Sequence, residues 1–462
     1  MWLAKIKSIF SANQSEPSSS LRRQLAMLSV PIFIETLLIM MLGAVDTFML
    51  SRYSDESVAA VGVVNQIVML AFLVFEVINL GTSVICSQYL GAGLKGRIPS
   101  VVMVALLTNL LLGLAVSGVL YFGDEMILRA MGLNEVLLPY GTAYMRIVGA
   151  FAFFQALSMT LSAALRADNL AIYPMAVTFI VNIVNIIGNY TLIFGKFGMP
   201  ALGVEGAAIS TATCRGIAML LLFIVVRRTI VKRIPWNVFV KFPWRELKNL
   251  LRVGLPSAGE QVSYSSSQMV ITYFINMLGV EALATRTYCV NLIMFAYLFC
   301  ISIALGGAIC IGHLVGHGRT RGAFLLGKLV MRLSIIITAS LSLLLAIAGP
   351  WVMPLLSSNP EIISLGCTIL WIDVLLEFGR PTNIFATNAL RAAGDVNYPF
   401  YVGVVVMWSV AVVAAYFAGI VFGLGLVGMW LAFACDENIR GVVFIRRWYS
   451  MKWASKSFAT RS

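Results

Sequence analysis

The second half of this chain repeats the first. A forward shift of 225 residues superposes the two halves without a gap as far as Pro399. The shift pairs identical residues along that length: Pro31 with Pro256, Glu35 with Glu260, Gly81 with Gly306, Gly91 with Gly316, and the Ala-Leu-Arg-Ala segment at 164–167 with that at 389–392. Such self-similarity indicates an internal duplication, so we expect two copies of one structural unit.

Both copies are almost wholly apolar. Of the 462 residues, 60% are hydrophobic and 11% are charged, so the chain has more apolar surface than a water-soluble core can bury. We therefore expect it to lie in a lipid bilayer, and duplicated membrane bundles are most typical of secondary transporters. The net charge of +13 does not indicate nucleic-acid binding, because the basic residues lie between the apolar stretches rather than in one patch.

Twelve stretches are long enough to cross the membrane, since a hydrocarbon core of roughly 30 Å needs about 20 apolar helical residues. They are 25–50, 58–88, 101–122, 137–164, 172–194, 204–226, 255–278, 283–314, 325–353, 362–389, 400–422 and 426–445. We predict an all-α membrane protein with twelve transmembrane helices in two pseudo-symmetric six-helix bundles. Because six spans return the chain to its starting side, the two bundles have the same orientation, a 6+6 parallel repeat.

The basic residues predict the orientation. They concentrate in the termini, the middle connection and the connections after the second and eighth spans, whereas the opposite connections hold few, Arg286 among them. By the positive-inside rule, we expect a plasma-membrane protein with both termini in the cytoplasm. The predicted units are a cytoplasmic N-terminal arm (1–24), an N-lobe (25–226), a basic cytoplasmic linker (227–252), a C-lobe (253–446) and a cytoplasmic tail (447–462).

Asp46 is the strongest candidate for ion coupling. It lies in the outer third of the first span, and no basic residue stands within two turns on its own helix. Charges inside a membrane are costly and rare, and a carboxyl without a cation there can bind and release a proton near neutral pH. The alternative is that Asp46 caps a helix end or bonds to Thr47 or a neighbouring span.

Glu35 and Glu260 are symmetry mates near the predicted cytoplasmic end, each four residues after the proline that opens its lobe. Glu35 also precedes Asp46 by about three helical turns, which places both carboxyls on one face and permits a proton path. Equally, both glutamates can pair with arginines such as Arg166 and Arg391.

The tenth span carries Asp373, Glu377 and Arg380 on one stripe, at positions i, i+4 and i+7. Their excess negative charge can attract a cation. Alternatively, the three form a self-satisfied buried triad that fixes helix packing.

A second polar stripe, Asn182, Asn185 and Asn189, follows one face of the fifth span. It needs a buried hydrogen-bonding partner, either a neighbouring helix or a watery cavity. We favour a cavity, because the stripe, Asp46 and Gln155 all belong to the first lobe. The candidate residues of the substrate cavity are Asn182, Gln155, Glu260, Asp373, Glu377 and Arg380.

Motifs for enzymatic chemistry are missing from the sequence. It contains no GxxxxGK[ST] phosphate loop, no nucleophile elbow and no metal-ligand cluster. His313 and His317 have the spacing of a helical zinc pair but lack its companion glutamate, so we interpret them as the polar end of the eighth helix. We predict that the protein is not an enzyme and uses no cofactor or metal.

Taken together, these residues resemble the multidrug and toxic compound extrusion (MATE) family over nearly the whole chain. The matching features are Pro31 at the start of a span that carries Val45-Asp46-Thr47, the two Ala-Leu-Arg-Ala segments, and LGVEGAAIST at 202–211. The resemblance implies two six-helix lobes in a V that export small organic, often cationic, molecules in exchange for inward H⁺ or Na⁺. The major facilitator superfamily shares the repeat, but its Asp-Arg signature is replaced here by GAGLKGR.

Within the family, the resemblance implies the proton-coupled, DinF-like branch rather than the sodium-coupled NorM branch. Asp46 matches the first-span aspartate of the proton-coupled branch, and Asn185 and Asn189 match positions where that branch has Asn and Asp. The sodium-coupled branch has a tenth-span acid where Arg380 stands here. The implied ion-coupling residues are Asp46, Glu35, Asn185 and Asn189.

Our hypothesis is a proton-driven antiporter that acts as a monomer on a small-molecule substrate. The alternatives are sodium coupling, or export of an anionic cargo such as a flavin nucleotide or lipid-linked precursor by Arg146, Arg215 and Arg380. A non-transporting receptor or scaffold is a remote alternative, because the sequence shows no appended soluble domain of useful length.

Overall fold

The computed structural model describes residues 19–232, 238 and 241–459, and within them it is helical with no β-strand. The predicted arm falls mainly on residues 1–18, outside the described residues, as do positions 233–237 and 239–240 of the predicted linker and 460–462 of the tail. The first helix of the described residues, α2, begins at Ser19, so the last residues of the predicted arm are helical.

The N-lobe consists of the helices before the middle connection: α2 (Ser19–Ser51), α3 (Asp55–Gly91), the short η1 (Lys95–Arg97), α4 (Ile98–Phe122), α5 (Asp124–Ala130), α6 (Leu138–Ala150), α7 (Ala152–Ala167), α8 (Ile172–Phe194) and α9 (Gly203–Thr229). The helices α6 and α7 meet at a 46° bend and are long and apolar enough to cross a membrane only when taken together.

The C-lobe follows with α11 (Trp244–Asn276), α12 (Val280–Gly316), α13 (Thr320–Leu356), α14 (Pro360–Ala392), a composite helix and α17 (Gly425–Tyr449). The composite helix joins α15 (Asn397–Val406), the π-helical η2 (Met407–Val412), α16 (Val413–Tyr416) and the π-helical η3 (Phe417–Val421). Inserted π turns are frequent at functional sites, and η2 contributes to a cavity described below.

The prediction of an all-α membrane protein is confirmed, and the described helices are roughly consistent with twelve spans. Nine helices of the described residues, and the bent pair α6 and α7, are long and apolar enough to cross a membrane by themselves. The helices α11 and α17 complete the set of twelve but are less apolar, because they carry groups such as Glu260, Gln268, Asp436 and Arg440. Polar side chains on a spanning helix have to face protein or a cavity rather than lipid.

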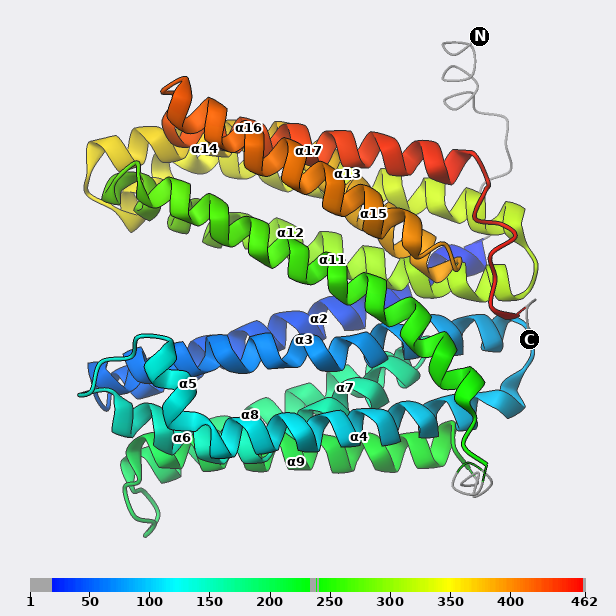
Figure 1. Ribbon diagram of the computed structural model, residues 1–462, viewed down its shortest axis with the longest axis horizontal. Helices are drawn as coiled ribbons and strands as arrows, with labels where there is room; N and C mark the ends of the chain where they lie inside the picture. The colour runs from blue at the N-terminus through cyan, green and yellow to red at the C-terminus, as the bar shows by residue number, and fades with distance from the viewer. Residues whose placement is uncertain (1–18, 233–237, 239–240, 460–462) are drawn as a thin grey trace.

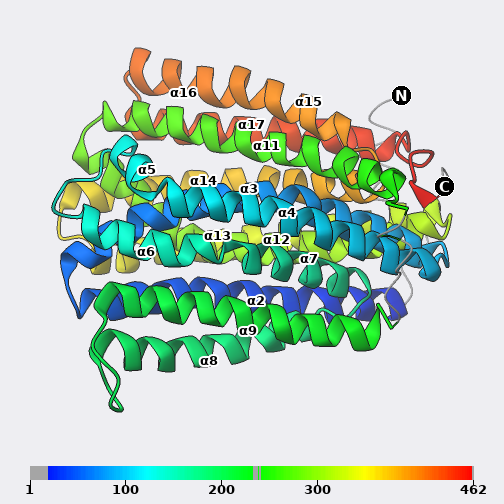
Figure 2. The same cartoon turned by 60° about the horizontal axis from the view of Figure 1, so that its bottom comes forward.

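The two lobes lie against each other as two groups of helices, α2 to α9 below and α11 to α17 above in Figure 1, and Figure 2 shows their helices running nearly parallel. We call the end of the molecule that carries Ser19, Gly91, Gly316 and Tyr449 the terminal end. Both described chain ends and the middle connection lie there.

Among the described residues, the lobes share hydrophobic cores only at the terminal end. There, Leu28 and Ile32 of α2 pack into the C-lobe cluster, and Leu250 and Val253 of α11 pack into the N-lobe cluster. At the opposite end, each lobe has a core cluster built from its own residues. The first helix of each lobe therefore crosses to the other lobe, and burial of apolar surface holds the lobes together at the terminal end.

At the terminal end, α3 and α12 also approach each other closely. We call this junction between the lobes the seam. A Cβ atom added at Gly91 would lie 2.1 Å from the carbonyl oxygen of His313, and one at Gly316 would lie 2.1 Å from that of Gln88. Gly91 and Gly316 are symmetry mates in the repeat. The glycines are required because no side chain fits where the two backbones cross.

The side chains beside these glycines also bond across the seam. Gln88 Nε2 donates to the Ala392 carbonyl (2.6 Å), and the symmetry mate of Gln88, His313, places Nε2 2.7 Å from the Ala167 carbonyl. Each of these side chains thus bonds the last turn of a helix in the other lobe. The backbone N–H of Phe458 donates to Gln88 Oε1 (2.7 Å), which ties the C-terminal segment to the same place.

We predict that Gly91→Ala destabilises the seam by about 1–3 kcal/mol, because the added methyl group forces two backbones apart. The expected result is a lower thermal unfolding midpoint of the purified protein in detergent. The matched control is Gly62→Ala on the same helix, where an added Cβ meets nothing within 4 Å. Equal midpoints for the two variants would contradict the prediction.

Candidate functional site

Two glutamate–arginine ion pairs occupy equivalent places in the two lobes. Arg166 Nη1 lies 3.0 Å from Glu35 Oε2, and Arg391 Nη2 lies 2.6 Å from Glu260 Oε2. The four residues are related by the repeat, and each pair joins the first helix of its lobe to the fourth span. Of the two alternatives open from the sequence, the structure shows the arginine pairing.

Asp46 lies at a junction of three N-lobe helices. Its Oδ1 accepts a hydrogen bond from Asn189 Nδ2 (2.6 Å). Asn189 Nδ2 also lies 3.0 Å from Asn185 Oδ1, and the Asn185 amide bonds Ser210 Oγ on α9 (3.5 Å). The chain of polar groups therefore connects α2, α8 and α9 through Asp46.

No ion pair to Asp46 is present among the described residues. Arg215 on α9 is close enough to act on Asp46 through its charge, but its guanidinium lies over the ring of Phe72, with Cζ 5.2 Å from the ring centroid. Its Nη1 is buried and has no hydrogen-bond partner within the described part of the chain. Asp46 itself is half-buried, and the hydrogen bond that it accepts comes from an amide.

The rest of the asparagine stripe also bonds to helices. Asn182 Nδ2 donates to the Leu38 carbonyl on α2 (2.8 Å), so the stripe fastens α8 to its neighbours. Gln155 lies half-buried on α7. Asn182 and Gln155 line neither of the two cavities described next.

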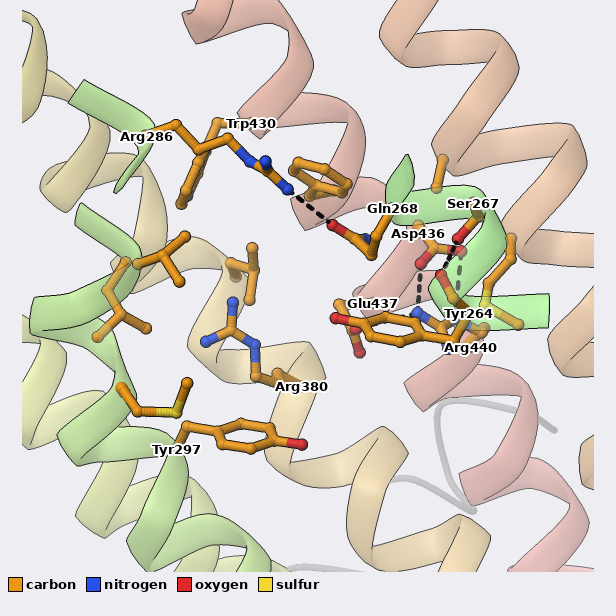
Figure 3. Close-up of a pocket in the computed structure, with 17 residues that line it drawn as sticks. Tyr264, Ser267, Gln268, Arg286, Tyr297, Arg380, Trp430, Asp436, Glu437 and Arg440 are labelled. Atoms are coloured by element: carbon orange, nitrogen blue, oxygen red, sulfur yellow. Dashed lines mark hydrogen bonds and ion pairs between the residues drawn. The ribbon is translucent and has the colours of Figure 1, made fainter. Parts of the chain in front are cut away.

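The first cavity lies inside the C-lobe, between α11, α12, α14, η2 and α17 (Figure 3). Its volume is about 310 Å³, at the lower end of the range for small-molecule sites. Apolar and aromatic side chains form most of the wall, including Ile293, Met294, Tyr297, Trp430 and Phe433. The charged lining residues are Arg286, Arg380, Asp436, Glu437 and Arg440.

Carboxylates neutralise two of the three arginines in this wall. Arg380 forms an ion pair with Glu377, three residues earlier on α14, and its Nη2 lies 3.5 Å from Asp373 Oδ1. Asp373 also accepts hydrogen bonds from Ser342 (3.2 Å) and from the indole of Trp430 (3.4 Å). The tenth-span residues thus come together as a triad, of which Arg380 reaches the cavity and the two fully buried acids stand behind it.

The other neutralised arginine belongs to α17 and was not singled out from the sequence. Arg440 pairs with Asp436 and with Glu437 Oε1 (2.9 Å), and Asn383 donates to Glu437 Oε2 (2.7 Å). The sequence does contain an indication of this group of charges, the run Asp-Glu-Asn-Ile-Arg at 436–440 inside an otherwise apolar span. Such intramembrane charges indicate a functional or buried polar site.

A second cavity, of about 370 Å³, lies between α3 of the N-lobe and helices of the C-lobe. Glu76 lines it from α3, and Glu260 and Arg391 line it from the C-lobe. It shares Tyr264, Tyr297, Arg380, Met407, Glu437 and Arg440 with the first cavity. The two cavities are therefore neighbours separated by one layer of side chains.

Two further residues from the sequence analysis, Arg146 and His313, lie outside these cavities. Arg146 forms an ion pair with Asp124 near the end of the N-lobe opposite the terminal end. His313 bonds the Ala167 carbonyl and Gln24, as a seam residue. Within the described residues, no group of three or more His, Cys, Asp or Glu side chains could hold a metal ion.

A duplicated bundle of spanning helices around a cavity with charged groups in its wall is typical of a membrane transporter. The family model MatE matches residues 31–191 and again residues 256–417, once in each copy of the repeat. The chain belongs to this family, the MATE transporters. It is a multi-pass membrane protein that exports compounds, and it is not an enzyme.

Individual relatives agree with this assignment. The chain is 40% identical over 432 residues to the uncharacterized transporter YisQ of Bacillus subtilis, covering 94% of this chain and 95% of that protein. It is 24% identical to a probable multidrug resistance protein NorM of Thermotoga maritima, covering 96% of each. The Vibrio cholerae MATE transporter VcmN in the bent form shares the fold, with a TM-score of 0.88, 17% identity, and coverage of 96% and 99%.

We predict that Glu377→Gln destabilises the protein by about 3 kcal/mol, because it removes one of the two carboxylates that neutralise a buried arginine. The matched control is Glu125→Gln, which breaks the surface pair that Glu125 forms with Arg129 on α5 and should leave stability unchanged. Both are read as thermal unfolding midpoints in detergent. A small shift for both variants would show that Arg380 does not depend on Glu377.

Proposed function

We propose that this transporter is a proton-coupled antiporter of the DinF-like branch. It exports small organic, often cationic, compounds across the plasma membrane, acts as a monomer and has both termini in the cytoplasm. The main support for this proposal is the half-buried Asp46 carboxylate. It accepts a hydrogen bond from the Asn189 amide and forms no ion pair among the described residues. A carboxyl in such surroundings can take up and release a proton, whereas one neutralised by an arginine cannot do so readily.

Protonation of Asp46 changes what its partners can bond. The ionised carboxylate accepts the Asn189 N–H, and addition of a proton turns one oxygen into a donor. The new O–H donor needs an acceptor, and the buried Asn189 Oδ1, which has no partner among the described residues, can supply one if the chain from Asp46 through Asn189 and Asn185 to α9 rearranges. Proton binding on one side of the membrane thereby favours one arrangement of α2, α8 and α9 over another.

The C-lobe cavity is the proposed substrate site. The acids around its inner part, Asp373, Glu377, Asp436 and Glu437, outnumber the two arginines among them, Arg380 and Arg440, and this surplus favours an organic cation. Glu260 lines the adjacent cavity between the lobes. Asp46 lines neither cavity, so proton and substrate are linked by the conformational equilibrium rather than by competition for one place.

We predict that Asp46→Asn lowers proton-driven export at least tenfold, since an amide cannot exchange a proton near neutral pH. The measurement uses inside-out vesicles with the reconstituted protein, a fluorescent organic cation such as ethidium, and either a proton or a sodium gradient. Asn189→Ala should slow export less, because it removes the hydrogen bond and keeps the carboxyl.

The matched control is Glu56→Gln, an exposed acid at the same end of the N-lobe. It should export ethidium as the unsubstituted protein does. Full proton-driven export by Asp46→Asn would remove Asp46 from the mechanism. Export that follows the sodium gradient and ignores the proton gradient would assign the sodium alternative.

A further inference from the structure

Within the described residues, one charged residue in the wall of the C-lobe cavity has no acidic partner. Arg286 stands in the second turn of α12, near the end opposite the terminal end, and lines the cavity with Val290 and Met294. Its Nη1 donates to Thr272 Oγ1 (2.7 Å) and its Nη2 to Gln268 Oε1 (3.3 Å). Both acceptors are neutral, and no ion pair involving Arg286 occurs within the part of the chain that the structure describes.

This separates Arg286 from the two other arginines of the cavity. Arg380 and Arg440 each contact two carboxylates, so little of their charge is left for a ligand. The positive charge of Arg286 is not compensated locally. An uncompensated guanidinium on a membrane-spanning helix is costly, so its presence needs a reason.

Fastening α11 to α12 is not a sufficient reason. The two helices are already joined by the short turn after Asn276, and a neutral side chain could bond Thr272 and Gln268 at lower cost. A guanidinium carries five N–H donors in a planar fork, and the two bonds within the described residues leave three of them for another acceptor. That fork matches the two oxygens of a carboxylate or a sulfonate.

The surroundings of Arg286 define the rest of the ligand. Figure 3 shows Arg286 extending across the cavity toward Gln268, with the indole of Trp430 beside it. Phe433 and Tyr264 add further aromatic surface to the same wall. Flat apolar walls with one cationic group at the end fit an aromatic ring that carries an anionic substituent.

We propose that Arg286 binds an anionic group of the exported compound, with its aromatic part against Trp430. This rests on the proposed role of the C-lobe cavity as the substrate site. Arg286 thereby determines specificity at the end of the cavity farther from the terminal end. The charge there is opposite to that of the acid-rich part around Arg380 and Arg440. Arg286 is not among the arginines Arg146, Arg215 and Arg380 that the sequence suggested for an anionic cargo.

The test is a binding measurement on the purified full-length protein in detergent, by titration calorimetry without an ion gradient. The two probes are 1-naphthoate and 1-naphthylmethylammonium, which share one ring system and carry opposite charges. Arg286→Gln should weaken naphthoate binding at least tenfold, and it should not weaken binding of the ammonium compound. Arg286→Lys should retain part of the naphthoate affinity, because it keeps the charge and loses the fork.

Two further variants separate ligand binding from helix packing. Thr272→Val removes a hydrogen bond of Arg286 and keeps its charge, so naphthoate binding should persist; a loss as large as that in Arg286→Gln would assign Arg286 a packing role. Trp430→Leu should weaken both probes, because it removes the shared ring contact. The control Arg146→Gln, at a paired arginine outside the cavity, should alter neither.

Equal naphthoate affinity in Arg286→Gln and the unsubstituted protein would overturn the proposal, as would failure of the unsubstituted protein to bind naphthoate. Because no gradient is applied, these outcomes are independent of proton coupling. Full proton-driven export by Asp46→Asn in the vesicle experiment would not affect the proposed role of Arg286. Unchanged naphthoate binding by Arg286→Gln would likewise not affect the proposed role of Asp46.

Discussion

The close packing of α3 against α12 at the terminal end is the contact on which the rest of the structure depends. Gly91 and Gly316 bring two backbones within a distance that excludes any side chain, and the neighbouring Gln88 and His313 bond across the same line. At the opposite end, each lobe has its own hydrophobic core. The lobes are therefore joined strongly at one end, and the second cavity lies between them next to that junction.

The duplicated scaffold carries chemistry that is not duplicated. The structural pairs, Glu35 with Arg166 and Glu260 with Arg391, recur in both lobes because both need the first helix fastened to the fourth span. The functional candidates do not recur. The repeat places Ile271 where Asp46 stands and pairs Gln155 with Arg380, and Asp373 and Glu377 have Val148 and Ala152 as counterparts. Each lobe has thus specialised, the N-lobe with the isolated acid and the C-lobe with the charged cavity.

The sequence predicted the features that follow from local pattern and repetition. Apolar stretches identify spans because lipid excludes free backbone groups, and the one-to-one repeat identified Glu35 and Glu260 as mates. It could not identify the partner of an intramembrane charge, since partners such as Asp46 and Asn189 stand 143 residues apart. For the same reason the sequence favoured a cavity at the asparagine stripe of the first lobe, whereas that stripe bonds neighbouring helices and the two cavities described above are lined mainly by the C-lobe.

Arg286 shows why a charge has to be interpreted together with its depth in the bundle. In the sequence, Arg286 was one of the few basic residues assigned to the connections on the side opposite the termini. It was used only to predict the orientation of the chain in the membrane. The structure places it inside α12, with its guanidinium in the cavity wall. A loop arginine is solvated by water, but one in a cavity wall needs a counter-charge from the protein or from a ligand.

Coupling between the lobes has to pass through contacts that both lobes share. Asp46 belongs to α2, and the same helix contacts α12 further along, where Phe33 stacks on Phe299 with ring centroids 4.2 Å apart and Gly306 admits the close approach of Ser29. The helix α12 in turn carries Arg286 and Tyr297 into the cavity. One helix therefore bears the acid toward one end and packs, toward the other, on the helix that lines the C-lobe cavity. A rearrangement around Asp46 that shifts α2 must also shift α12 or break this packing, because close-packed helices change between discrete arrangements and do not deform continuously.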